Sequence, residues 1–143
     1  MLKGIPKIIS PELLKVLMEM GHTDEIVIAD GNFPAVTNAQ RLIRLDGHGV
    51  PEILEAILKF FPLDTYVEEP AVLMEVVKGD PIVPVIWNEY ENIVKAKHEK
   101  FNGFKHIDKF EFYDRAKEAF AVIATGEEAL YANIILKKGV VVE

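Results

Sequence analysis

The sequence contains no cysteine in its 143 residues, which excludes disulfides, thiolate metal sites and thiol catalysis. It also lacks any run of the roughly 18–20 apolar residues that a membrane-spanning helix needs. Basic residues are outnumbered, 16 against 23 acidic ones, and the formal net charge is −7. That charge argues against nucleic acid or an anionic membrane as the main partner. With no signal-peptide pattern in residues 1–7, we expect a soluble cytoplasmic protein.

The common catalytic and cofactor signatures are absent as well. Gly47-His48-Gly49 opens neither a dinucleotide-binding fingerprint nor a phosphate-binding loop, and no G-x-S-x-G elbow occurs. No two histidines have the i, i+4 spacing of a helical metal site. We therefore expect neither a metal nor a cofactor.

The composition that remains is that of one globular domain. Half of the residues are hydrophobic and 27% are charged. A chain of this length buries enough surface to fold without disulfides or a structural metal. The mean hydropathy of +0.14 is high for a small soluble monomer, which is a hint of subunit contact.

Helical and strand-like patterns alternate, which favours an α/β or α+β layered fold. The first helix is clearly signalled, because Ser10 is a good N-cap, Pro11 suits the first turn and Gly21 is a natural stop. Apolar spacing predicts further helices at residues 50–61, 86–100 and 112–119. Strands are predicted at residues 25–29, 41–45, 65–67, 72–77, 120–124, 133–136 and 140–142.

His22 is the strongest local candidate for chemistry. It follows the predicted helix stop in Gly21-His22-Thr23-Asp24, where a loop side chain reaches a cleft more readily than the core. Imidazole gives and takes protons near neutral pH. A plain surface histidine is the competing interpretation. Asp24 could orient the ring or could simply open the following strand.

Two further polar candidates flank predicted strands. Asp30 stands at the carboxyl end of the strand at 25–29, where open α/β sheets commonly bind ligands, and its carboxylate could accept two sugar hydroxyls. An Asx turn with Gly31 is equally compatible. Tyr131 and Asn133 would face the same way on extended chain and could line a polyol site, or they could support a turn.

The other three histidines carry weaker signals. His48 lies in a glycine-flanked turn, His98 on the solvated side of the third helix, and His106 just before a short strand. These residues alone predict a small α/β protein with a polar, histidine-containing cleft and name no substrate.

Several stretches, taken in order, match one superfamily over residues 2–141. They lie at residues 10–14, 20–22, 24–27, 32–35, 43–44, 46–47, 110–113, 119–122 and 131–139. The chain resembles the superfamily shared by L-fucose mutarotases and D-ribose pyranases. Residues 63–66 and 110–124 resemble the fucose branch most.

The resemblance implies an α/β fold: one compact domain over residues 1–143, with a mixed sheet layered with helices. It implies a ring-shaped homodecamer of two pentamers with sites between neighbouring subunits, and a monosaccharide substrate, L-fucose, whose α and β anomers are interconverted. It assigns His22 as the general acid. It assigns sugar contacts to Asp30, Lys109, Tyr131, Ala132 and Asn133.

Three positions depart from the fucose pattern. Thr23 and Ala132 stand where the fucose branch usually has glycine, and in this they resemble the ribose branch. Lys109 stands where arginine is usual. Lysine keeps the charge but loses the planar two-pronged geometry.

Ring opening and closure require proton exchange at the anomeric hydroxyl and at the ring oxygen, which favours histidine as an acid that is also the returning base. Tyr131 could assist as a hydrogen-bond donor, and His106 is an outside candidate for a second acid–base group. A D-ribose pyranase, a broader aldose mutarotase, a non-catalytic sugar-binding module and a structural ring subunit are the alternatives.

Overall fold

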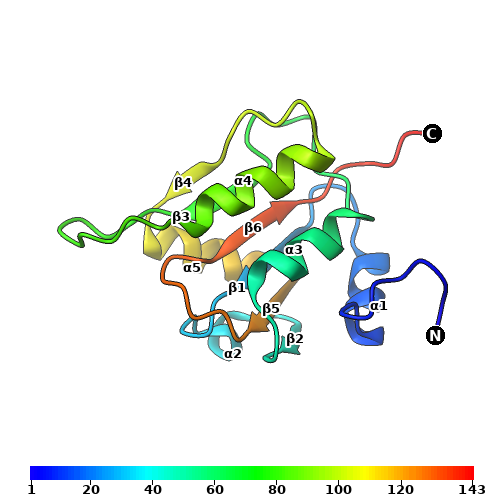
Figure 1. Cartoon of the computed structure of the whole chain (residues 1–143), viewed down its shortest axis with the longest axis horizontal. Helices are drawn as coiled ribbons and strands as arrows, with labels where there is room; N and C mark the ends of the chain where they lie inside the picture. The colour runs from blue at the N-terminus through cyan, green and yellow to red at the C-terminus, as the bar shows by residue number, and fades with distance from the viewer.

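A single mixed sheet organises residues 1–143, all of which are described by the computed structural model (Figure 1). Its strand order is β2-β5-β1-β6-β3-β4. Only β6 runs antiparallel to its neighbours; the β1–β5, β2–β5 and β3–β4 pairs are parallel. The strands are β1 (Glu25–Ala29), β2 (Leu42–Leu45), β3 (Ala71–Met74), β4 (Lys105–Ile107), β5 (Ala121–Thr125) and β6 (Ile134–Lys137).

Helices cover both faces of this sheet. One face packs against α1 (Pro11–Glu19), α3 (Val50–Leu58) and α4 (Ile86–Lys97), and the other against α2 (Ala35–Asn38) and α5 (Lys109–Glu118). Strand side chains alternate between the two cores: Ile26 and Ile28 join the larger one, Val27 and Ala29 the smaller. Both faces are buried, so the central strands are continuous apolar runs. The predicted α/β fold with a mixed, helix-layered sheet is confirmed.

Helix starts follow the local sequence. Ser10 Oγ accepts the Leu13 N–H at 3.2 Å and Pro11 occupies the first turn, as predicted for α1. Asp108 Oδ1 caps α5 by accepting the N–H groups of Phe110 and Glu111 at 2.9 and 3.0 Å. None of the helices combines the length and the apolar character needed to span a membrane.

Two strand predictions are wrong. Residues 65–67 form an exposed bend, because the preceding segment meets the sheet only through the bridge between Leu63 and Lys138. Residues 140–142 lie beyond β6 with no strand to pair with and are exposed. β3 ends at Met74, before the predicted 77, and α4 ends at Lys97. Segments 65–67 and 140–142 both have the β-branched or aromatic residues typical of strands, but neither has a neighbouring strand to pair with.

Candidate functional site

The polar residues predicted at 30 and 131–133 meet at one edge of the sheet. β1 and β6 are antiparallel with Ile28 opposite Ile134, which places Asp30 across from Ala132. The Ala132 N–H donates to Asp30 Oδ2 at 3.3 Å, and the Asp30 N–H donates to Asn133 Oδ1 at 2.7 Å. This register joins residues that are about 100 positions apart in the sequence.

A cleft of about 240 Å³ opens at this edge. Asp30 is buried at its base, and burial raises the pKa of its carboxyl, assisted by the negative charge of Glu127 and opposed by hydrogen bonds from the N–H groups of Asn32, Ala132 and Phe33. The Asn32 N–H bond to Asp30 Oδ1, at 3.0 Å, is the alternative Asx turn. The turn and the cleft therefore coexist. The lining residues are Asp30, Asn32, Phe33, Met74, Asp80, Tyr113, Leu130, Tyr131 and Asn133.

Tyr131 enters the cleft from a left-handed backbone with φ of 57°. Trp87 Nε1 donates to its carbonyl oxygen at 2.7 Å, which holds this conformation. Its hydroxyl donates to Asp80 Oδ2 at 2.7 Å and accepts the Val77 N–H at 3.3 Å. Tyr131 and Asn133 both line the cleft, although β6 begins only at Ile134, and their contact with a sugar stays a prediction. Asp80 was missed, because nothing in the loop sequence around it signals a phenol partner.

Lys109 lies at the margin of this group. It is the first residue of α5, and its ammonium sits 5.3 Å from the centre of the Phe110 ring. Tyr113, which lines the cleft, is one helical turn further on the same face. Lys109 itself does not line the cleft, so its sugar contact stays a prediction.

His22 lies at the opposite edge of the sheet, held by Asp64. Its Nε2 is 3.1 Å from Asp64 Oδ1; the imidazole is 38% exposed and the carboxylate only 1%. Asp64 reaches it because the Asp64 N–H donates to the Lys137 carbonyl, while the Thr23 N–H donates to that of Lys138. Asp24 does not orient the ring, because its carboxylate accepts the Gly21 N–H at 2.8 Å.

The Asp64 carboxylate fixes the protonation pattern of the imidazole. Burial alone would raise the pKa of Asp64, but hydrogen bonds from the Tyr66 N–H and His22, with the charge of Lys137, lower it. An ionised carboxylate can only accept, so Nε2 carries the hydrogen. No hydrogen bond within the chain occupies Nδ1. The free nitrogen is therefore available to exchange a proton with a ligand. The sequence comparison placed residues 63–66 among the stretches that resemble the fucose branch but predicted no role for Asp64.

The two halves of the predicted site are separated by the length of β1. Five residues at roughly 3.3 Å each make about 17 Å, with His22 before the strand and Asp30 after it. In Figure 1 the end of the sheet where β6 begins lies toward the protruding loop between β3 and α4, whereas both termini lie at the other end. One chain alone does not bring His22 to Asp30.

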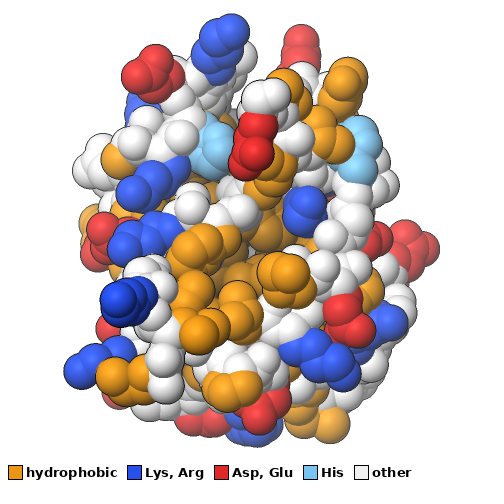
Figure 2. Space-filling view, turned by 90° about the vertical axis from the view of Figure 1, so that its right-hand side faces the viewer, with side chains coloured by type: hydrophobic (Ala, Val, Ile, Leu, Met, Phe, Trp, Pro, Cys, Tyr) orange, Lys and Arg blue, Asp and Glu red, His pale blue; other side chains and the backbone are white.

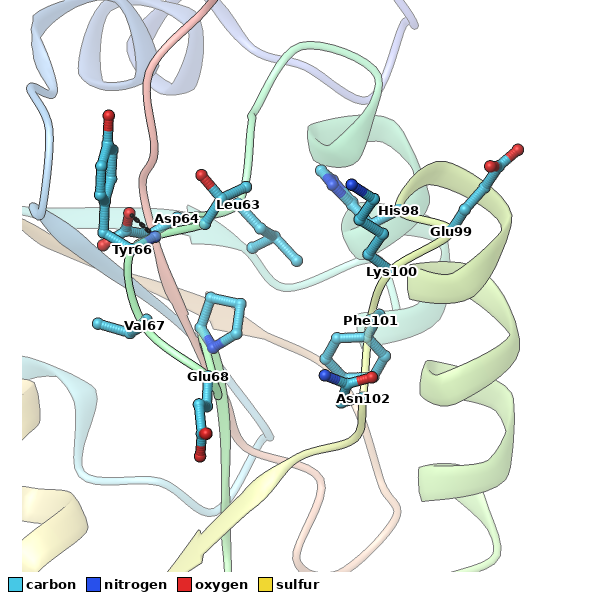
Figure 3. A pocket seen from close by; sticks show the side chains of 12 residues that line it. Leu63, Asp64, Tyr66, Val67, Glu68, His98, Glu99, Lys100, Phe101 and Asn102 are labelled. Atoms are coloured by element: carbon cyan, nitrogen blue, oxygen red, sulfur yellow. Dashed lines mark hydrogen bonds between the residues drawn. The ribbon is translucent and has the colours of Figure 1, made fainter.

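A cavity of about 640 Å³ lies beside Asp64. Figure 3 shows Asp64, Tyr66 and Val67 on one wall and His98, Phe101 and Asn102 on the other. Tyr66 is 76% exposed, and the centre of its ring lies 5.4 Å from that of His22. No residue of the Asp30 cleft lines this cavity.

Comparison with known proteins identifies the family. The model of the RbsD / FucU transport protein family matches residues 3–141. The chain belongs to this family. The predicted superfamily resemblance is thus confirmed. The chain is 54% identical to a fucose mutarotase of Homo sapiens, covering 97% of this chain and 94% of that protein. It is 49% identical to an L-fucose mutarotase of Actinobacillus pleuropneumoniae, covering 98% and 97%.

Solved structures of the RbsD / FucU family share the fold. The crystal structure of a fucose mutarotase from Streptococcus pneumoniae in complex with L-fucose superposes with a TM-score of 0.93, at 52% identity over 99% of this chain and 100% of that one. FucU from Bifidobacterium longum gives 0.95 at 56% identity, covering 98% and 100%. RbsD of Bacillus subtilis, at 24% identity and a TM-score of 0.71, shows the same fold, with 99% and 100% covered.

The other three histidines do not line the Asp30 cleft and make no hydrogen bond to His22 or Asp64, although His98 lines the cavity beside Asp64. His48 Nδ1 is 3.1 Å from Glu52 Oε1 on the exposed start of α3. His106 is in β4 and packs against Trp87, with ring centres 5.0 Å apart. His98 is not on the solvated side of a helix: it caps α4 in extended conformation and its Nε2 is buried.

Thr23 is held in a strained conformation beside His22, with φ of 74°. A β-branched residue there costs about 1 kcal/mol, which glycine avoids. We expect Thr23→Gly to raise the free energy of unfolding by about 1 kcal/mol, measured by chemical denaturation. The matched control is Thr37→Gly in α2, which should lower it because that threonine is helical. If both variants lost the same free energy of unfolding, the inference that Thr23 is strained would be contradicted.

Proposed function

We propose that this protein is a sugar isomerase that interconverts the α and β anomers of L-fucose. The observation that carries the proposal is the TM-score of 0.93 at 52% identity with a fucose mutarotase solved with L-fucose. Curated relatives that are about 50% identical over nearly the full length are also named fucose mutarotases. The geometry agrees, because a polar cleft and a carboxylate-held imidazole are what ring opening requires.

The site would be built by two subunits. One supplies the His22–Asp64 pair. Its neighbour supplies the cleft lined by Asp30, Tyr131 and Asn133, with Lys109 at its margin and the buried Ala132 bonded to Asp30. The separation of about 17 Å along β1 supports this, because no single chain closes it. The cleft of about 240 Å³ is also below the roughly 300–1,000 Å³ of complete small-molecule sites.

Apolar surface at both edges supports the same assembly. Exposed hydrophobic side chains near the cleft are Val36, Val77, Ile82, Val83, Val85, Phe110 and Leu130. Those toward the His22 edge include Leu2, Met18, Tyr66, Val67, Val140 and Val141. Figure 2 looks onto the end that carries both termini and shows hydrophobic side chains gathered around a hollow, with histidine side chains nearby. Two different surfaces that meet head to tail form rings when the rotation closes, in keeping with a decamer of two pentamers.

The reaction then needs only proton transfers. His22 enters protonated on both ring nitrogens. The anomeric hydroxyl of the sugar passes its proton to the Tyr131 oxygen as the bond from C1 to the ring oxygen breaks, and Nδ1 of the His22 imidazolium delivers its proton to that ring oxygen. Rotation about C1–C2 presents the other face of the aldehyde, and reversal of the transfers closes the ring. Asp30 and Asn133 hold the remaining hydroxyls.

The test is exchange spectroscopy by NMR on L-fucose and, separately, on D-ribose, with and without protein. Faster exchange between the α and β signals of L-fucose is the expected result. Line broadening by binding without faster exchange would instead support a non-catalytic sugar-binding module. Acceleration of ribose alone would replace fucose by ribose as the substrate.

A further inference from the structure

A carboxylate outside the predicted residues is bound directly to the phenol of the cleft. Asp80 lies in the loop between β3 and α4, and its Oδ2 accepts the Tyr131 hydroxyl at 2.7 Å. Its other oxygen, Oδ1, accepts the Ile82 N–H at 3.1 Å, and its own N–H donates to the Val77 carbonyl at 3.0 Å. These two local hydrogen bonds hold the Asp80 carboxylate in place beside the Tyr131 hydroxyl.

The hydrogen bonds of the phenol define what it can offer to a sugar. Tyr131 has one hydroxyl hydrogen, which points to Asp80, and one of its two lone pairs accepts the Val77 N–H at 3.3 Å. One lone pair remains, so the phenol oxygen faces the cleft as an acceptor. A sugar hydroxyl would donate to it. This is the reverse of the donor role expected from the sequence.

The hydrogen bond to Asp80 also raises the pKa of Tyr131 above its usual value of 10. A phenol that stays protonated at neutral pH cannot act as a phenolate base. It can take a proton only if it passes its own proton on at the same time, and the only carboxylate hydrogen-bonded to it is that of Asp80.

We propose that Asp80 is the positioning residue that makes Tyr131 a proton acceptor in the mutarotase site. This inference rests on the proposed function. In ring opening, the anomeric O–H bond breaks and its proton goes to the Tyr131 oxygen, while the phenol proton moves to Asp80 Oδ2. The electron pair left on the anomeric oxygen forms the C=O bond as the C1–ring-oxygen bond breaks. The ring oxygen takes the Nδ1 proton of the His22 imidazolium of the neighbouring subunit, which is left neutral. Closure returns each proton.

Asp80→Asn is the test variant, because the amide oxygen can keep the Ile82 N–H bond while the side chain no longer takes up a proton. We expect kcat for L-fucose exchange to fall about 10–100-fold with KM changed less than about threefold. Glu75→Gln changes an exposed carboxylate on the same loop that is not hydrogen-bonded to Tyr131; it is the matched control and should match the unaltered protein.

A double-mutant cycle with Tyr131→Phe separates this role from a structural one. If Asp80 acts through the phenol, Asp80→Asn should cost less than about twofold in the Tyr131→Phe background. Formate should also restore exchange in Asp80→Ala several-fold, whereas chloride at equal ionic strength should not. An equal loss in both backgrounds, or no loss in either, overturns this inference alone. Absence of exchange in the unaltered protein overturns the proposed function with it.

Discussion

Replacing His22 by alanine should lower the catalysed rate of L-fucose anomer exchange about 10²–10⁴-fold, the usual contribution of a positioned acid–base group. The imidazole is the only proton-transfer group at its edge of the sheet with a free ring nitrogen and a buried carboxylate behind it. NMR exchange spectroscopy at several protein concentrations measures the effect.

Two comparison variants make this result specific. In His22→Asn the amide N–H can still donate to Asp64, so the fold is kept while the titrating group is lost, and the same drop is expected. His48→Ala removes a histidine that also lies 3.1 Å from a carboxylate, but at an exposed position outside the site. It should leave the rate unchanged. Normal exchange in a folded His22→Ala protein would remove His22 from the mechanism.

Co-expressing His22→Ala chains with Tyr131→Phe chains should restore activity that neither variant has by itself. If each site joins the histidine of one subunit to the cleft of the next, random mixing leaves about one quarter of the sites intact. Two affinity tags isolate the mixed oligomers, and the exchange rate per subunit is compared with that of each pure variant.

The matched control combines two defects in the same half of the site. His22→Ala chains mixed with Asp64→Asn chains carry no intact imidazole–carboxylate pair, so no recovery is expected. Mixed oligomers of the first kind that stay inactive would show that His22 and Tyr131 do not act across a subunit contact. Sedimentation of the same samples reports the ring size.

Local pattern predicted the elements that depend on near neighbours. The cap at Ser10, the buried strand at Glu25–Ala29 and the polar end at Asp30 all follow from residues a few positions away. Segments 65–67 and 140–142 failed because strand formation depends on a distant partner, which their composition does not report.

Site residues divide in the same way. The Asp30 and Tyr131–Asn133 segments were found because strand ends concentrate polar chemistry. Asp64 and Asp80 were not, because each is tied to a candidate site residue by one hydrogen bond that spans 42 or 51 residues: Asp64 to His22, and Asp80 to the Tyr131 phenol. A lone aspartate in a loop looks the same in sequence whether or not it has such a partner.

By itself, the sequence determined the α/β class and the family and predicted the residue types proposed for the chemistry, because hydrophobic period, capping and motif order are local properties of the chain. The tertiary structure alone decided the distances between these residues. The β1–β6 register brings Asp30 to Ala132, while the length of β1 keeps His22 at the other edge. That separation, a consequence of strand geometry, is why the proposed chemistry requires a second copy of the chain.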